Sequence, residues 1–303
     1  MKIAVVGAGN VGTALAILLA QENEVVLLDT APEKVEKINQ FVSPAQDPYI
    51  QEYLDEAKEE NIELNLRATT KYEDAITGAD YVIIATPTRQ KGGFDVSNIN
   101  DTIKKVMAID DPMITVVIKS AVPVGYTEAM CEKYNTEAIF FSPEFSREGN
   151  ELYDNLYPPR IIVGSYSNEA QKFMKMLQKI AIRKNVPTLF LNNSEAEAVE
   201  IFTNAYLALR AAYLDELDAY AKKKGLNRQN IVEIMKLDPR ISLDYVDLSF
   251  GCGDNYLVEE VKRTLASRTE LAPKKPKRKP TNRVTVASGE TNEEKRSRRQ
   301  AKK

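Results

Sequence analysis

Three glycines near the N-terminus have the spacing of a phosphate-binding loop. Gly7, Gly9 and Gly12 form a G-x-G-x-x-G pattern directly after the apolar run from Ile3 to Val6. In this pattern the first glycine permits a tight turn, the second lets the backbone approach a diphosphate, and the third allows close packing of helix on strand. Free N–H groups and the dipole at the start of the next helix favour an anion. The chemistry predicted here is binding of a dinucleotide.

An acidic residue at the end of the next apolar run completes the pattern. A helical stretch leads to the run from Val25 to Leu28, which ends at Asp29, 17 residues after Gly12. A carboxylate at this point can accept hydrogen bonds from the two ribose hydroxyls, which favours NAD over NADP. A βαβ unit without a ligand is the alternative, but strand, glycines, helix, strand and acid together are typical of a dinucleotide site. We therefore predict NAD as the cofactor.

Composition limits the other kinds of chemistry. The chain has 303 residues, 43% of them hydrophobic, with no histidine and two cysteines, Cys131 and Cys252. The lack of histidine excludes Ser–His and Cys–His nucleophile pairs, histidine metal sites and a histidine base, and we predict no metal site. Two isolated cysteines are typical of a reducing compartment. With no leader and no apolar run near twenty residues, we expect a cytoplasmic protein without a membrane partner, or a nuclear one in a eukaryotic host.

Strands alternating with helical stretches predict an α/β fold with a doubly wound parallel sheet of the Rossmann type over residues 1–192. The later strands are expected at 79–88, 114–120, 138–144, 160–164 and 188–191, with the last closing the sheet. Ligands of such sheets bind at the C-terminal ends of the strands. Gly7, Thr86, Ser120 and Ser142 all fall at these ends.

The periodicity changes over residues 193–266, which we assign to a central helical region. From Glu195 to Lys224, apolar residues recur three or four apart until Gly225, a residue typical of a helix end. One long helix with more apolar surface than a single domain face needs is predicted. A core helix and a dimer-forming helix fit this pattern equally well, and we predict a homodimer through it. A shorter helix is expected from Asn227 to Leu237.

A basic tail, which we predict to be disordered, follows at 267–303. Residues 268–303 contain 13 Lys and Arg against 4 Asp and Glu, and they lack an apolar pattern that could be buried. Clustered positive charge can bind nucleic acid or another acidic partner. A solvated tail that improves solubility explains the composition equally well. No aromatic residue lies among the tail charges, so base stacking is not indicated.

The chain from Met1 to about residue 266 resembles the UDP-glucose 6-dehydrogenase family. The shared motifs are the glycine loop, Asp29 with Lys34, Ala-Thr-Pro-Thr ending at Thr88, Lys-Ser-Ala-Val-Pro-Val-Gly ending at Gly125, and the segments 142–149, 156–163, 194–199 and 204–210. The resemblance implies a dimer-forming helix and an NAD site made by Gly7, Gly9, Asn10, Val11, Gly12, Asp29, Lys34 and Thr86. It also implies substrate contacts from Glu144, Glu148, Asn204, Arg240, Phe250 and Gly251.

The family oxidises a sugar alcohol twice, and the resemblance assigns this chemistry to four positions at which this chain departs. A cysteine nucleophile carries the aldehyde and then the thioester, but here its position is Tyr256, a phenol that forms no thioester. A lysine that stabilises the oxyanion is replaced by Glu200, which reverses the charge. The threonine that holds the attacking water is Ala121, and the aspartate is Glu260.

We therefore expect a catalytically inactive relative that binds NAD and acts as a dimeric scaffold. Glu144, Glu148 and Asn204 are retained. Cys252 lies four residues before the nucleophile position, too far for an efficient replacement if the loop keeps its path. The family's C-terminal UDP-binding domain is expected to be absent. The alternatives are an oxidoreductase with residual activity on a UDP-sugar, and a nucleic-acid-associated protein acting through residues 268–303.

Overall fold

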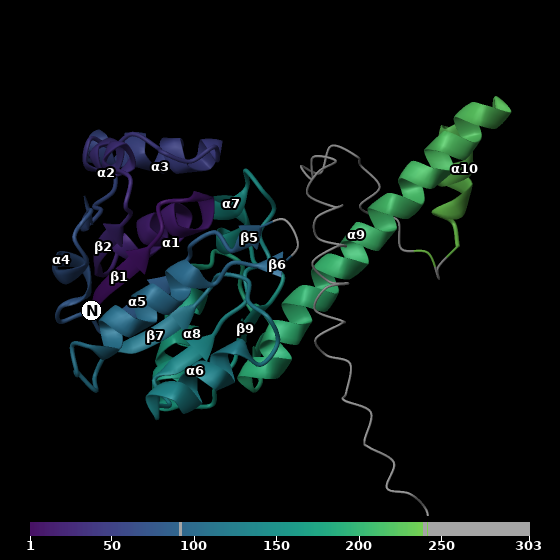
Figure 1. The fold of residues 1–303 in the computed structure, drawn as a ribbon. Coiled ribbons are helices and arrows are strands. Elements are labelled where there is room, and N and C mark those ends of the chain that lie inside the picture. The colour runs from purple at the N-terminus through teal and green to yellow at the C-terminus, as the bar shows by residue number, and fades with distance from the viewer. Residues whose placement is uncertain (91–92, 239–240, 242–303) are drawn as a thin grey trace, which may run out of the picture. The chain divides into compact units, whose positions relative to one another are not determined.

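A six-stranded parallel sheet forms the centre of the N-terminal part of the protein (Figure 1). The computed structural model describes residues 1–90, 93–238 and 241. The strand order is β3-β2-β1-β4-β7-β8. The strands span Lys2–Val6 (β1), Glu24–Leu28 (β2), Leu66–Thr69 (β3), Tyr81–Ile84 (β4), Thr115–Ile118 (β7) and Ile139–Phe141 (β8). The order reverses direction at β1 and β4, which makes the sheet doubly wound, as predicted.

Helices cover both faces of this sheet, which explains why its strands are continuous apolar runs. In β1, Ile3 and Val5 face one apolar cluster, and Ala4 and Val6 face the other. The first cluster includes α1 (Asn10–Ala20), α3 (Pro48–Lys58), α7 (Glu151–Leu156) and α8 (Asn168–Ile180). The second includes α4 (Tyr72–Ile76), α5 (Ser97–Met107) and α6 (Tyr126–Tyr134). Helix α2 (Pro32–Asn39) adds Ile38 to the first cluster.

Two details of the sheet differ from the sequence-based expectation. Strand β3 was not predicted, and the last two strands expected in the sheet, at 160–164 and 188–191, do not join it. Instead β10 (Thr188–Phe190) pairs in parallel with β9 (Ile161–Val163) as a separate two-stranded sheet. At the outer edge of β8 the backbone N–H of Phe141 donates to Asn193 Oδ1 at 2.8 Å, and its carbonyl accepts the N–H of Gly164, directly after β9, at 2.7 Å. A short hairpin is formed by β5 (Arg89–Gln90) and β6 (Gly93–Phe94).

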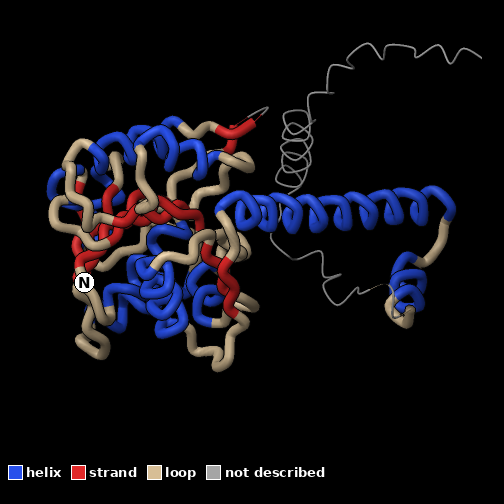
Figure 2. The backbone as a smooth tube through the Cα atoms, turned by 90° about the horizontal axis from the view of Figure 1, so that it is seen from below, coloured by secondary structure: helices blue, strands red, loops and turns tan. Residues whose placement is uncertain are grey.

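The predicted long helix is present as α9 (Asn193–Lys224), drawn in Figure 2 as the longest helical segment. It begins with a capping box in which the Asn192 side chain accepts from the backbone N–H of Glu195 and the Glu195 side chain accepts from that of Asn192. It ends at Gly225, whose φ of +63° is left-handed. Its first part contacts α6, β8 and β9, and α10 (Arg228–Met235) packs on its later part.

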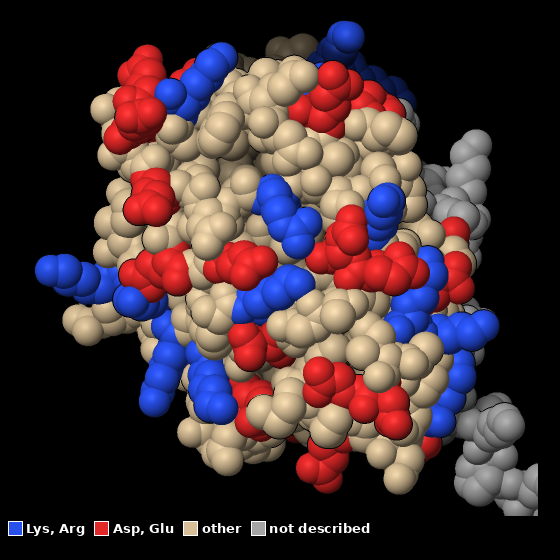
Figure 3. All heavy atoms as spheres, turned by 90° about the vertical axis from the view of Figure 1, so that its left-hand side faces the viewer, with Lys and Arg blue, Asp and Glu red and all other residues tan. Residues whose placement is uncertain are grey.

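Charges of both signs are mixed on the face of the sheet domain that Figure 3 presents. That face therefore has no extended basic area of the kind that binds a phosphate backbone. Within the described ranges, no helix is long and apolar enough to span a bilayer. The predictions for the tail at 267–303 lie outside the described residues.

Candidate functional site

The glycine loop between β1 and α1 has little room for side chains on two of its three glycines. A Cβ on Gly12 would lie 1.9 Å from the carbonyl oxygen of Gly7, and a Cβ on Gly7 would lie 2.6 Å from that of Ala85. Gly7 also has a left-handed φ of +109°. A Cβ on Gly9 would meet nothing within 4 Å. The loop is therefore closely packed on the protein side and open at Gly9, which fits the approach of a diphosphate to the start of α1.

Asp29 follows β2 and holds the loop from the other side. Its Oδ2 accepts the backbone N–H of Ala8 at 2.7 Å, and its Oδ1 accepts that of Ala31 at 2.9 Å. Lys34 lies 3.4 Å from Oδ2. Oδ2 accepts from both Ala8 and Lys34, whereas Oδ1 accepts from Ala31 and keeps one acceptor site for a ribose hydroxyl. The sequence predicted the residue, and the structure adds its role in fixing the loop.

The other predicted strand ends lie along the same edge. The Ser120 hydroxyl after β7 donates to the carbonyl of Ile84 in β4 at 3.2 Å. The Ser142 hydroxyl after β8 donates to the carbonyl of Ile162 in β9 at 3.0 Å. Both hydroxyls therefore join neighbouring strands, and they are positioned to support the site rather than to contact a ligand.

Thr86 has a different environment at the end of β4. Its Oγ1 is buried and has no hydrogen-bond partner among the described residues. Buried hydroxyls normally have a partner, so this atom fits the cofactor contact that the resemblance implies. Two residues later, the Thr88 hydroxyl donates to the backbone carbonyl of Ala121 at 2.7 Å, which brings the loop after β7 beside the loop after β4.

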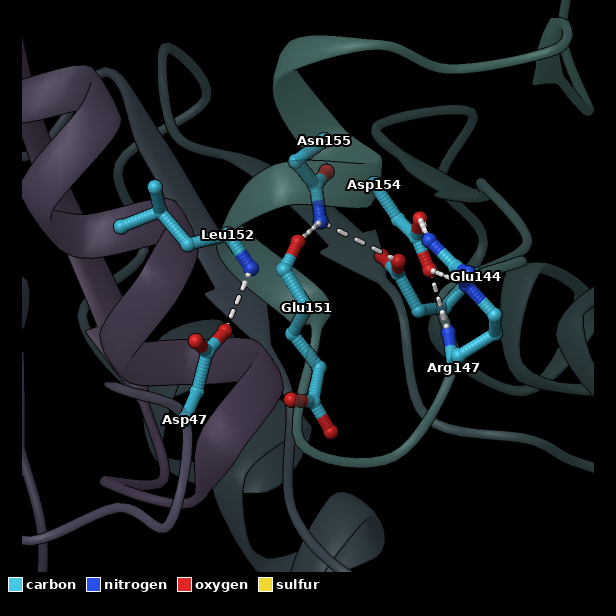
Figure 4. A network of polar contacts seen from close by, with 7 residues as sticks. All are labelled: Asp47, Glu144, Arg147, Glu151, Leu152, Asp154 and Asn155. Atoms are coloured by element: carbon cyan, nitrogen blue, oxygen red, sulfur yellow. Dashed lines mark hydrogen bonds and ion pairs between the residues drawn. The ribbon is translucent and has the colours of Figure 1, made fainter. Parts of the chain in front are cut away.

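Glu144 is held by partners that the sequence analysis did not identify. Its Oε2 lies 3.1 Å from Lys119 Nζ. Its Oε1 accepts from Asn155 Nδ2 at 3.2 Å, as Figure 4 shows. The Lys119 side chain is 4% exposed, so the ion pair neutralises a buried cation. The cavity of about 40 Å³ beside these residues has room for a few water molecules rather than for a nucleotide sugar.

The remaining predicted catalytic and substrate residues are only partly described. Glu148 is exposed, Glu200 is 5% exposed, and Asn204 is half-buried. Glu200 and Asn204 are four residues apart in α9 and therefore share a face. Five predicted residues lie outside the described ranges, namely Arg240, Phe250, Gly251, Tyr256 and Glu260.

A buried acid on α9 connects this helix to the loop after β7. Glu197 is fully buried and accepts the backbone N–H groups of Gly125 at 2.6 Å and Thr127 at 2.8 Å, at the start of α6. Burial raises the pKa of Glu197, and the hydrogen bonds from Thr127 and Gly125 lower it in part. The helical periodicity places residue 197 beside the buried positions 196 and 201, a signal that the sequence analysis did not use.

We expect NAD to raise the melting temperature of the protein, because a ligand that binds the folded state stabilises it by mass action. Asp29→Ala should remove this increase, because it deletes the ribose acceptor and two bonds that hold the loop. Differential scanning fluorimetry with NAD up to millimolar concentration measures the effect. Asp101→Ala, at an exposed acid on α5, is the control and should respond like the wild type. A wild-type protein that shows no shift would contradict the assignment.

Comparisons with known proteins support the cofactor site. The model of the NAD binding domain of the UDP-glucose/GDP-mannose dehydrogenase family matches residues 1–182, and the model of its central domain matches residues 194–276. The UDP-glucose 6-dehydrogenases of Streptococcus pneumoniae and Campylobacter jejuni are 44% and 41% identical. In each case the match covers 88% of this chain and 68% of the relative.

A solved structure agrees with these sequence matches. The UDP-glucose dehydrogenase of Pyrobaculum islandicum superposes with a TM-score of 0.75 at 26% identity, covering 88% of this chain and 66% of that one. The likeness therefore extends over the sheet domain and the long helix together.

Proposed function

Because the chain belongs to the UDP-glucose/GDP-mannose dehydrogenase family and carries its NAD-binding domain, we propose that it binds NAD without oxidising a UDP-sugar and acts as a dimeric scaffold. The packing of the glycine loop and the two backbone bonds to Asp29 support NAD binding. The loss of activity is inferred from the residues at the catalytic positions.

The main observation behind the proposed loss of activity is that Glu200 is buried. Its side chain lies on the inner part of α9 and is 5% exposed, at the position where the family resemblance places an oxyanion-stabilising lysine. A carboxylate in a site of low dielectric opposes the growth of negative charge on a substrate oxygen. The replacements of the nucleophile by Tyr256 and of the water ligand by Ala121 act in the same direction.

We expect the full chain to form no NADH above background with UDP-glucose or other UDP-sugars, even at high protein concentration. Tyr256→Cys alone should also be inactive, because catalytic groups that work as a unit contribute little when their partners are absent. The matched comparison is the triple variant Tyr256→Cys, Glu200→Lys, Ala121→Thr. Absorbance at 340 nm measures turnover. Steady multiple turnover by the unmodified protein would contradict the proposal and make Cys252 the first candidate nucleophile.

The same assay decides the residual-oxidoreductase alternative. The retained Glu144 favours it, since Lys119 and Asn155 hold this carboxylate in a fixed position. The nucleic-acid alternative is favoured by the 13 basic residues within 268–303. Salt-dependent binding of DNA or RNA that is lost when these residues are deleted would support it, because phosphate contacts release counterions.

We further propose that α9 forms the homodimer. Five of its six exposed large apolar side chains lie on one stripe, at spacings of three, four and seven residues. The residues are Phe202, Tyr206, Leu209, Tyr213 and Tyr220, and each is more than 50% exposed. A second copy of the same helix would cover this stripe in a two-fold interface. An apolar stripe of this length is unusual on the surface of a monomer.

Leu209→Asp should dissociate this dimer at micromolar concentration, because it buries a carboxylate in the proposed apolar interface. Leu207→Asp is a matched control, since Leu207 is 49% exposed on another face of α9. Light scattering of both variants and the wild type measures the mass. A monomeric wild type, or an equal effect of the two substitutions, would contradict the proposal.

A further inference from the structure

The first residue of α1 is fixed from two directions. Asn10 follows Gly9 directly, and its Nδ2 donates to Glu151 Oε1 at 3.0 Å. Its Oδ1 accepts the backbone N–H of Gln46 at 3.2 Å. The glycine loop is thereby connected to α7 and to the segment before α3, which are distant in sequence. The residue that anchors the loop on the α7 side is an acid.

Glu151 is an unusual residue for this position. It is 4% exposed, and its Oε2 has no hydrogen-bond partner among the described residues. It stands near the N-terminus of α1, where the amides would receive the NAD diphosphate. Figure 4 shows its carboxylate beside Asp47, another buried acid, which accepts the backbone N–H groups of Tyr49 at 2.9 Å and Leu152 at 2.8 Å.

We propose that Glu151 is a positioning residue of the coenzyme site, and that its charge sets the affinity for NAD. The neutral acid still accepts the Asn10 bond and leaves the start of α1 attractive to a diphosphate. The carboxylate anion also accepts that bond but adds a negative charge close to a negatively charged ligand. NAD affinity should therefore fall as Glu151 ionises. This inference rests on the NAD binding proposed above.

The surroundings of Glu151 favour the neutral form. Burial raises its pKa most, and the charge of Asp47 raises it as well, while hydrogen bonds from Asn10 and from the backbone of Glu151 and Gly149 lower it in part. The two helices that contact α7 supply no compensating cation at this point. Helix α1 has no charged residue, and the charged side chains of α3 are exposed, namely Glu52, Asp55, Glu56 and Lys58.

Other titrating groups interfere little with this signal. On α7 itself, Asp154 is paired with Arg147 at 2.6 Å. The chain contains no histidine, the side chain that ordinarily changes charge between pH 5 and 8. Mutating the single carboxyl group of Glu151 therefore tests whether a pH dependence of NAD binding between pH 5 and 8 comes from this residue.

The direction of the effect follows from linkage. A bound diphosphate raises the pKa of Glu151 further. At a pH where Glu151 is ionised in the free protein, NAD binding is therefore accompanied by uptake of a proton. The dissociation constant should then rise with pH between the two pKa values. The total rise is about tenfold for each unit by which NAD shifts the pKa.

The test is calorimetric titration of the full chain with NAD from pH 4.5, the ordinary pKa of a glutamate, to pH 8.5. Glu151→Gln keeps an acceptor for Asn10 and removes the charge, so its affinity should be independent of pH and about tenfold tighter than that of the wild type at pH 8.5. Glu52→Gln removes an exposed carboxylate from α3 and should follow the wild type. Melting temperatures of the free variants show that each is folded.

Two outcomes would overturn the inference, and they differ. An identical pH dependence in the wild type and Glu151→Gln contradicts the role of Glu151 while leaving NAD binding intact. Absence of NAD binding in every variant at every pH contradicts the proposed function itself, and the inference fails with it. If Glu151 had a purely structural role, Glu151→Gln would lower stability or NAD affinity at all pH values without changing how the affinity depends on pH.

Discussion

Gly12→Ala should abolish NAD binding and destabilise the sheet domain by about 3 kcal/mol, a large effect for one methyl group. The added Cβ would lie 1.9 Å from the carbonyl oxygen of Gly7; that oxygen is a backbone atom and the Cβ is fixed by its own backbone, so neither can rotate away. Relieving the contact requires α1 to move off β1, and α1 is almost wholly buried. Urea denaturation and NAD titration measure the two effects.

Gly9→Ala is the matched control for this substitution. Gly9 has an ordinary extended φ of −88°, and a Cβ there meets nothing within 4 Å. The variant should fold with nearly wild-type stability while binding NAD weakly, because its methyl group faces the open side where the diphosphate would lie. Equal stability losses in the two variants would show that the loop packs differently.

Glu197→Ala should lower the free energy of unfolding by about 3 kcal/mol, because two backbone amides lose their acceptor. These are the N–H groups of Thr127, which is buried, and of Gly125, which is half-buried. Chemical denaturation measures the loss. Glu195→Ala breaks the exposed capping box of the same helix and should lower the free energy of unfolding by about 1 kcal/mol.

A smaller loss for Glu197→Ala than for Glu195→Ala would contradict this account. It would mean that the start of α6 finds other acceptors when the carboxylate is removed. Glu197→Gln keeps one acceptor oxygen and should lie between the alanine variant and the wild type.

Local patterns in the sequence predicted the parts of the site that depend on local structure. The glycines and Asp29 fall within one βαβ unit, so their spacing alone indicates the cofactor loop. Asp47 followed by Pro48 is a pattern typical of a helix start, and it could have predicted the beginning of α3 from the sequence. The pairing of Asn10 with Glu151 spans 141 residues and depends on how α7 packs against α1, which no local pattern specifies.

The errors in the fold have similar causes. Strand β3 is four residues long, and its Arg67 is exposed at the edge of the sheet, so it lacks the apolar run by which the other strands were recognised. Strands β9 and β10 pair with each other outside the main sheet, and the Phe141 N–H at the edge of β8 donates to the Asn193 side chain, 52 residues away. No local pattern specifies a contact over this sequence distance.

Because only its first part is packed on the sheet domain, α9 should have two levels of protection against amide hydrogen exchange along its backbone. The second and third turns carry Glu197 and the buried Ile201, so their amides can exchange hydrogen with solvent only when the sheet domain itself opens. The turns near Leu214 are supported within the described chain by a small cluster with Val232 on α10. In an isolated chain those turns would fray on a much shorter timescale, and association along the exposed stripe would slow their exchange to that of the core.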